Sequence, residues 1–197
     1  MTNLWWRAAC GRRAGSILWR IDLPTGKNGQ FELRLHVLFV LTALCVTFLL
    51  ARTLFPAMFP GWASASYWLV ALAVTLIDGL AGLLHELGHA VVALARGRKV
   101  HHITLYGLVA AARRSAGSQI PRDQLVIAVA GPVSQMLMAS VLMFAATALP
   151  SDNPPLRVAA GFPGLTNLLV GLLNLLPLSP LDGGRAARAL VAVVVRV

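Results

Sequence analysis

Long apolar runs dominate the pattern of hydrophobic and polar positions along this chain. A helix that crosses ~30 Å of hydrocarbon needs about 20 residues, and these runs are about that long or longer. Apolar side chains occupy all sides of the runs, which is typical of helices that face lipid and satisfy their backbone polar groups internally. The runs lie at 37–55, 67–95, 124–149 and 159–176, the last interrupted by prolines. The pattern predicts an all-α polytopic membrane protein with about four transmembrane helices.

A different pattern follows the second run. The stretch VHHITLYGLVAA, residues 100–111, alternates between apolar and polar positions and contains β-branched and aromatic residues. Such alternation predicts a short membrane-associated strand or hairpin, placed against the inner face of the membrane. The edge of that strand would carry unpaired backbone groups, which an extended peptide could satisfy.

Composition supports one membrane domain. The chain has 197 residues, of which 57% are hydrophobic and 12% are charged, too few for a solvated globular surface. No stretch is long or polar enough for a separate soluble domain. We divide the chain into a basic cytoplasmic or interfacial arm over 1–34 and a transmembrane core over 35–197, with a proline-broken segment at 177–185.

The net charge of +10 is distributed unevenly. Basic residues cluster before the first run and between the second and third runs: Arg7, Arg12, Arg13, Arg20, Lys27, Arg34, Arg96, Arg98, Lys99, Arg113, Arg114 and Arg122. Because basic loops stay in the cytoplasm, the N-terminus and the loop over 96–123 are expected there. Topology and anionic lipid account for these charges, so the sequence predicts membrane lipid as a partner and no nucleic acid.

The sequence HELGH at 85–89 places two histidines and a glutamate inside the second run. On a helix, His85 and His89 project from one face and can bind one metal ion, with Glu86 beside them to hold a water molecule. The alternative is a pair of hydrogen-bonded core histidines, which would leave a buried glutamate to explain. Three ionisable residues within five positions of a membrane helix normally mark a functional site.

A catalytic zinc site needs a third protein ligand and an open position for water. Apart from Glu86, Asp78 and Asp182 are the acidic residues that lie neither in loops nor at the ends of the runs. Asp78 precedes His85 by seven residues, which is ~10 Å along a helix and too far to share an ion. Asp182 follows Pro177 and Pro180, which break the fourth run and free backbone groups at membrane depth. We therefore predict that Asp182 is the third ligand, the alternative being an ordinary turn at a helix end.

The HELGH motif together with NLLPLSPLDG at 174–183 resembles the site-2 protease family of intramembrane zinc metalloproteases. The resemblance covers about 31–188 and includes AGPVSQ at 130–135, although the family often has Asn where Gln135 stands. It implies that His85, His89 and Asp182 bind one Zn²⁺ per chain and that Glu86 is the catalytic base. It also implies that Asn174 holds the substrate or the developing oxyanion; by chemistry alone, a cap on the broken helix is the alternative. With no PDZ insertion visible, the chain most resembles the compact, sporulation-factor-like branch.

The resemblance implies hydrolysis of a peptide bond within or next to a transmembrane segment of a membrane-anchored substrate, such as a single-span regulator. We expect an integral protein of a bacterial cytoplasmic membrane, with its site near the cytoplasmic side. Two alternatives remain: a metal-binding membrane protein or transporter, and a protease scaffold that binds without turnover. Asp78 is expected to line a water path or to hydrogen-bond near the site, the alternative being a solvated position near a kink at Gly79. Arg185 is expected to orient Asp182 or to bind headgroups.

Overall fold

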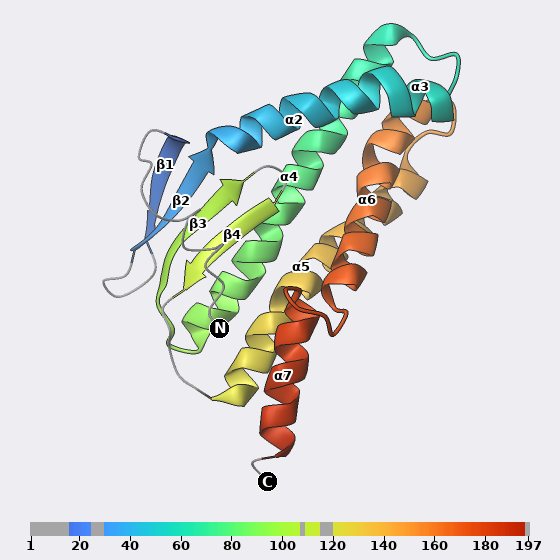
Figure 1. The fold of residues 1–197 in the computed structure, drawn as a ribbon. Helices are drawn as coiled ribbons and strands as arrows, with labels where there is room; N and C mark the ends of the chain where they lie inside the picture. The colour runs from blue at the N-terminus through green and yellow to red at the C-terminus, as the bar shows by residue number, and fades with distance from the viewer. Residues whose placement is uncertain (1–15, 25–29, 107–108, 115–119, 196–197) are drawn as a thin grey trace.

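Four long helices form the body of the protein in the computed structural model, which describes residues 16–24, 30–106, 109–114 and 120–195. Each is long and apolar enough to cross a membrane, which confirms the predicted class of fold (Figure 1). The first span, Val37–Met58, comprises α2 (Val37–Leu49), a π-helical turn (Leu50–Leu54) and α3 (Phe55–Met58). The others are α4 (Ser64–Ala95), α5 (Pro121–Ala148) and α6 (Pro154–Asn174).

The last membrane helix begins earlier than predicted, at Pro154 instead of 159. Prolines at the first helical positions lack only an N–H that would have no partner in the helix. The side chain of Asn153 caps this end by accepting a hydrogen bond from the backbone N–H of Leu156 at 3.2 Å. α6 ends at Asn174, and after the proline-containing segment 175–181 a separate helix α7 (Asp182–Val194) begins.

A four-stranded sheet, with strand order β1-β2-β3-β4, lies beside the C-terminal half of α4 (Figure 1). The predicted hairpin after the second span is confirmed as β3 (Val100–Tyr106) and β4 (Val109–Arg114), which pair antiparallel. β1 (Ile17–Pro24) and β2 (Gln30–His36) form a second antiparallel pair. β2 pairs with β3 in parallel, and the two membrane spans between them supply the long crossover connection that a parallel pair needs.

β1 and β2, which lie largely in the basic arm, were not predicted from the sequence. Their sequences nevertheless alternate, since apolar Leu33 and Leu35 lie between polar Glu32, Arg34 and His36. Glu32 accepts a hydrogen bond from the Nε of Arg34 at 2.7 Å, and this bond lowers the pKa of the glutamate. Charged residues thus occupy the polar positions of a strand in this arm.

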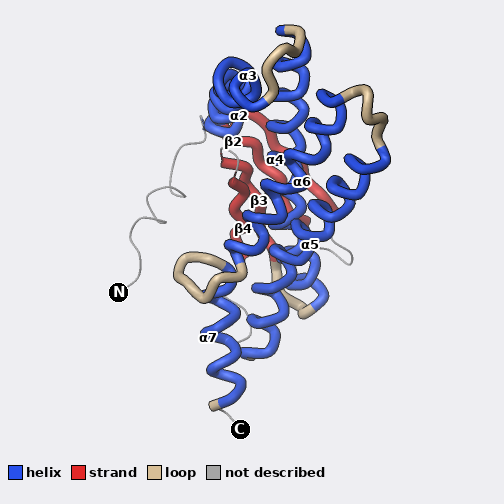
Figure 2. Tube along the Cα trace, turned by 90° about the vertical axis from the view of Figure 1, so that its right-hand side faces the viewer, coloured by secondary structure: helices blue, strands red, loops and turns tan. Residues whose placement is uncertain are grey.

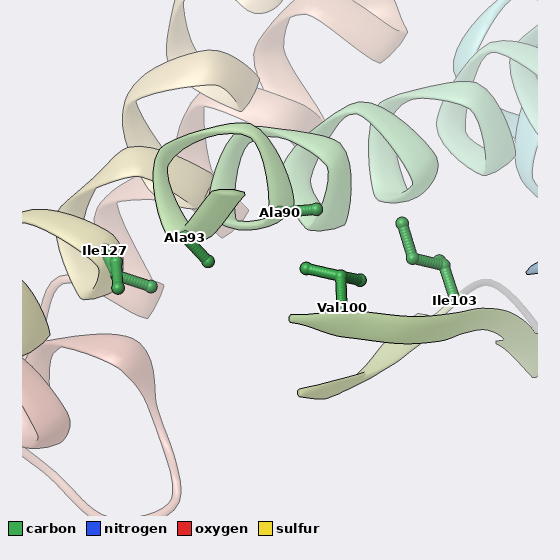
Figure 3. Close-up of a cluster of buried hydrophobic side chains, with 5 residues drawn as sticks. All are labelled: Ala90, Ala93, Val100, Ile103 and Ile127. Carbon is green, nitrogen blue, oxygen red and sulfur yellow. The ribbon is translucent and has the colours of Figure 1, made fainter. Parts of the chain in front are cut away.

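A cluster of small and branched apolar side chains joins the sheet to the helices. Ala90 and Ala93 of α4 face Val100 and Ile103 of β3, and Ile127 of α5 closes the cluster (Figure 3). All five are buried, Ile103 completely. Because alanine has little side-chain volume, the strand can pack close to α4 just beyond His89.

α5 is the central helix of the bundle and packs against α4, α6 and α7. Figure 2 shows α7 beside one end of α5, beyond the turn that follows α6. After the fourth span, the turn thus brings the start of α7 back into the bundle, against α5. The first residue of α7 therefore lies against α4 and not at the surface of the bundle.

Candidate metal centre

α4 positions both histidines of the HELGH sequence. Their spacing of four residues brings the imidazole rings onto one helix face, with ring centroids 4.8 Å apart and planes at 86°. The two Nε2 atoms are 3.2 Å apart. His89 is completely buried, and His85 is 9% exposed. Both rings therefore present one nitrogen to a common point inside the bundle.

Asp182, at the first position of α7, brings a carboxylate oxygen to the same point. Its Oδ2 lies 2.9 Å from Nε2 of His85 and 3.0 Å from Nε2 of His89. The carboxyl group is also buried. His85, His89 and Asp182 are the group of described residues whose ligand atoms lie close enough together to hold a metal ion.

Two glycines permit this convergence. A Cβ at Gly131 of α5 would lie 2.3 Å from Nε2 of His89, so the absence of a side chain leaves room for the imidazole. A Cβ at Gly183 would lie 2.1 Å from the carbonyl oxygen of Leu175. Gly183 therefore lets the start of α7 fold back onto the end of α6, which places Asp182 next to the histidines.

The tautomer of His89 follows from its backbone partner. Nδ1 of His89 lies 2.6 Å from the carbonyl oxygen of Ile127, which can only accept a hydrogen bond. Nδ1 must therefore carry the proton. In the neutral ring Nε2 then holds a lone pair, and it faces Asp182 and His85.

His85 has a comparable contact on its other nitrogen. Its Nδ1 lies 3.0 Å from Oε1 of Gln135, a buried residue of α5. With a proton on Nδ1 the hydrogen bond is made, and Nε2 of His85 also holds a lone pair. Such contacts on the outer nitrogen are what orient histidine ligands in metal sites.

The three converging atoms fit a zinc ion. With both imidazoles neutral and protonated on Nδ1, two nitrogens and a carboxylate oxygen, all acceptors, face one another at 2.9–3.2 Å. A metal cation between them would remove their repulsion. Tetrahedral Zn²⁺ with bonds of about 2.0–2.1 Å places its ligand atoms about 3.3 Å apart. The observed spacings are within a few tenths of an ångström of that value, and three protein ligands leave a fourth position open.

Glu86 is the chain neighbour of one cluster residue, and Arg185 contacts another. Glu86 follows His85 on α4 and is buried, at 8% exposure. Nη2 of Arg185 lies 2.7 Å from Oδ1 of Asp182, an ion pair one turn along α7. Its N–H is not aligned for a hydrogen bond, since Oδ1 has no hydrogen-bond partner among the described residues. Arg185 thus lies on Oδ1 of the carboxylate, and Oδ2 faces the histidines.

The other predicted site residues lie outside the cluster of three. Asn174 is the last residue of α6 and is half-buried. Asp78 is half-buried on α4 and accepts hydrogen bonds from Asn167 at 2.6 Å and from Thr166 at 3.2 Å, both on α6. Asn167 was not singled out from the sequence. A buried amide inside an apolar span was the available indication.

The fold and the cluster together define a polytopic membrane protein with a buried His, His, Asp candidate metal centre. The family model described as Peptidase M50B-like matches residues 63–178, a range that includes HELGH and ends before Asp182. The chain therefore belongs to the site-2 protease family of M50B-like membrane zinc metalloproteases.

Individual relatives of the chain are also zinc metalloproteases by name. Rip3 of Mycobacterium tuberculosis, named as a candidate zinc metalloprotease, is 34% identical over 174 residues, which are 86% of this chain and 44% of Rip3. The zinc metalloprotease MJ0392 of Methanocaldococcus jannaschii is 31% identical over 129 residues, which are 64% of this chain and 35% of that protein. The chain thus spans less than half the length of these curated relatives.

A solved structure is also similar. The site-2 protease from Methanocaldococcus jannaschii superposes with a TM-score of 0.56 at 26% sequence identity, covering 88% of this chain and 72% of that one. The likeness thus extends from the sequence motifs to the arrangement of the helices.

Proposed function

We propose that this chain forms the catalytic core of an intramembrane zinc metalloprotease. Its substrate would be a membrane-anchored protein, cut at a peptide bond within or next to a transmembrane segment. The observation that carries the proposal is the convergence of Nε2 of His85, Nε2 of His89 and Oδ2 of Asp182 within 3.2 Å of one another, with Glu86 buried next to His85.

His85, His89 and Asp182 would hold one Zn²⁺ per chain. When bound, zinc supplies Lewis acidity, which lowers the pKa of water toward about 7 and polarises a carbonyl group. Glu86 would accept a proton from the attacking water and return it to the leaving amine nitrogen, as a general base and then a general acid. Arg185 would keep the carboxylate of Asp182 turned toward the histidines.

The site would lie near the cytoplasmic side of the membrane. His89 precedes Arg96 by seven residues, ~10 Å of helix, and Arg96 begins the basic loop that the positive-inside rule assigns to the cytoplasm. Arg96 also forms an exposed ion pair with Asp123 at the start of α5. The ends of α4 and α5 on this side thus carry the charges that suit a membrane surface. We place the N-terminus on the same side and the protein in a bacterial cytoplasmic membrane.

The substrate must reach the site in an extended form. A transmembrane helix keeps its amides in internal hydrogen bonds, so its scissile region must unwind before its carbonyl can react. Asn174, at the end of α6, would bind the extended chain or the developing oxyanion. Helix-breaking residues near the scissile bond are expected to favour cleavage.

Co-expression with candidate single-span regulators tests this proposal. Mass spectrometry of the products should show cleavage within or next to the membrane segment for the wild type and none for Glu86→Gln. Glu32→Gln is a matched control, because Glu32 is the other glutamate of the chain and lies on β2, away from the cluster. Cleavage that persists in Glu86→Gln would refute the mechanism.

A further inference from the structure

A line of buried polar side chains runs across the membrane bundle and ends at His85. Oε1 of Gln135 contacts Nδ1 of His85 at 3.0 Å, and Nε2 of Gln135 donates to Oδ1 of Asn167 at 3.0 Å. Nδ2 of Asn167 donates in turn to Oδ1 of Asp78 at 2.6 Å. Gln135 and Asn167 are each 4% exposed. Three helices, α4, α5 and α6, each contribute to this line.

The far end of the line fixes the direction of every hydrogen bond in it. Nδ2 of Asn167 also lies 2.8 Å from the carbonyl oxygen of Pro163, which can only accept. Oδ1 of Asp78 accepts from Thr166 as well as from Asn167. With two acceptors on one side, Asn167 must turn its NH₂ group there and its oxygen toward Gln135.

The orientation of Asn167 then determines that of Gln135. An amide side chain has nearly the same shape when its oxygen and nitrogen are exchanged, so packing alone does not select the orientation. The oxygen of Asn167 requires a donor, and Gln135 meets this with its NH₂ group. The oxygen of Gln135 is therefore the atom that faces His85.

The orientation of Gln135 in turn selects the tautomer of His85. Facing an oxygen, Nδ1 of His85 carries the proton, and Nε2 keeps a lone pair for a metal ion. If Gln135 were reversed, its NH₂ group would require the lone pair on Nδ1. The proton would then move to Nε2 and point at the cluster, where it would compete with metal binding.

We infer that Asp78 and Asn167 are positioning residues which, through Gln135, hold His85 in the tautomer that can ligate a metal. The inference rests on one part of the proposed function, the binding of a metal at His85. It does not require that the chain cleaves a peptide bond. Burying a carboxyl group and two amides inside apolar spans costs free energy unless they form hydrogen bonds. Here Asp78, Asn167 and Gln135 bond to one another in turn, and Gln135 contacts His85. Removing an outer partner of a metal-bound histidine typically weakens metal binding about 10–100-fold.

The experiment measures the dissociation constant for Zn²⁺ of the full chain in detergent, by competition with a chromogenic chelator. Asp78→Leu removes the carboxylate acceptor, Asn167→Leu removes the amide that links it to Gln135, and each should weaken binding about tenfold. Asp78→Asn keeps an acceptor oxygen and should stay within about threefold of the wild type. Thr75→Val is the matched control on α4, because this buried hydroxyl bonds to Thr47 and to the carbonyl oxygen of Ala71, away from the line. Its affinity should equal that of the wild type.

A double-mutant cycle separates positioning from a general effect on packing. Gln135→Met removes the contact with His85, and adding Asp78→Leu to it should weaken Zn²⁺ binding no further, since Asp78 acts only through Gln135. Two losses that multiply would overturn the inference, as would wild-type affinity in both Asp78→Leu and Asn167→Leu. If the wild type binds Zn²⁺ tightly but cleaves no substrate, the proposed function fails. The Zn²⁺ affinities of the variants still test the inference in that case.

Discussion

The carboxylate of Asp182 lies 2.9 Å from the imidazole of His85, although the two residues are 97 positions apart in the chain. The contact joins the first residue of α7 to the middle of α4, through the turn that follows α6. It extends a helical histidine pair to a cluster of three candidate metal ligands.

Replacing Gly131 should displace a ligand. A Cβ at this position would lie 2.3 Å from Nε2 of His89, so Gly131→Ala should move the ring and weaken Zn²⁺ binding at least tenfold. Alanine favours a helix by about 1 kcal/mol over glycine, so α5 itself should remain intact. Gly161→Ala is the control, because its Cβ would meet Ala146 at an ordinary 3.4 Å. Equal affinities of the two variants for Zn²⁺, measured by chelator competition, would contradict the geometry.

Metal removal should destabilise the fold. A ligand that binds only the folded state stabilises it by about 2.7 kcal/mol at a hundredfold excess over its dissociation constant. Chelation should therefore lower the melting temperature of the wild type, and added Zn²⁺ should restore it. His89→Ala should melt at the same temperature with and without chelator. If neither chelation nor added Zn²⁺ changes the melting temperature of the wild type, metal binding does not stabilise the fold.

Arg185 should contribute modestly to the site. Its guanidinium pairs with Asp182 at 2.7 Å, but the side chain is 48% exposed, and exposed ion pairs are weak. Arg185→Gln is expected to weaken Zn²⁺ binding about two- to fivefold, measured by chelator competition. Arg188→Gln, one turn further along α7, is the control and should leave the affinity unchanged. Equal effects of the two variants would indicate a general charge effect and not orientation of Asp182.

The sheet should depend on Ile103. This side chain is completely buried between β3 and α4, and truncating such a residue to alanine typically costs about 2–5 kcal/mol. Ile103→Ala should expose the strands to proteolysis and to faster amide exchange. Leu18→Ala on β1, where the side chain is 53% exposed, should change protection little. The same protection in both variants would show that the sheet is held by other contacts.

Local spacing in the sequence was enough to predict part of the site. His85, Glu86 and His89 lie within five residues, and helix geometry alone places the two imidazoles together. Asp182 could be predicted because prolines break the span before it and few other acidic residues lie within the membrane. The hairpin after the second span was predicted from its alternating pattern.

The remaining features depend on how helices rotate against one another. Whether Gln135 faces His85, and Asn167 faces Asp78, is set by the packing of α5 between α4 and α6, which no local pattern encodes. β1 and β2 were missed for a different reason. Their alternation is present in the sequence, but the many basic residues of the arm are equally typical of a segment that lies at the membrane interface.

The zinc content of the purified chain tests the central claim most directly. Elemental analysis of the wild type, Asp182→Ala and Glu32→Gln should find about one Zn²⁺ per chain in the first and third and much less in the second. A wild type without zinc after exposure to the metal, or an Asp182→Ala variant that retains it fully, would contradict a centre built from His85, His89 and Asp182.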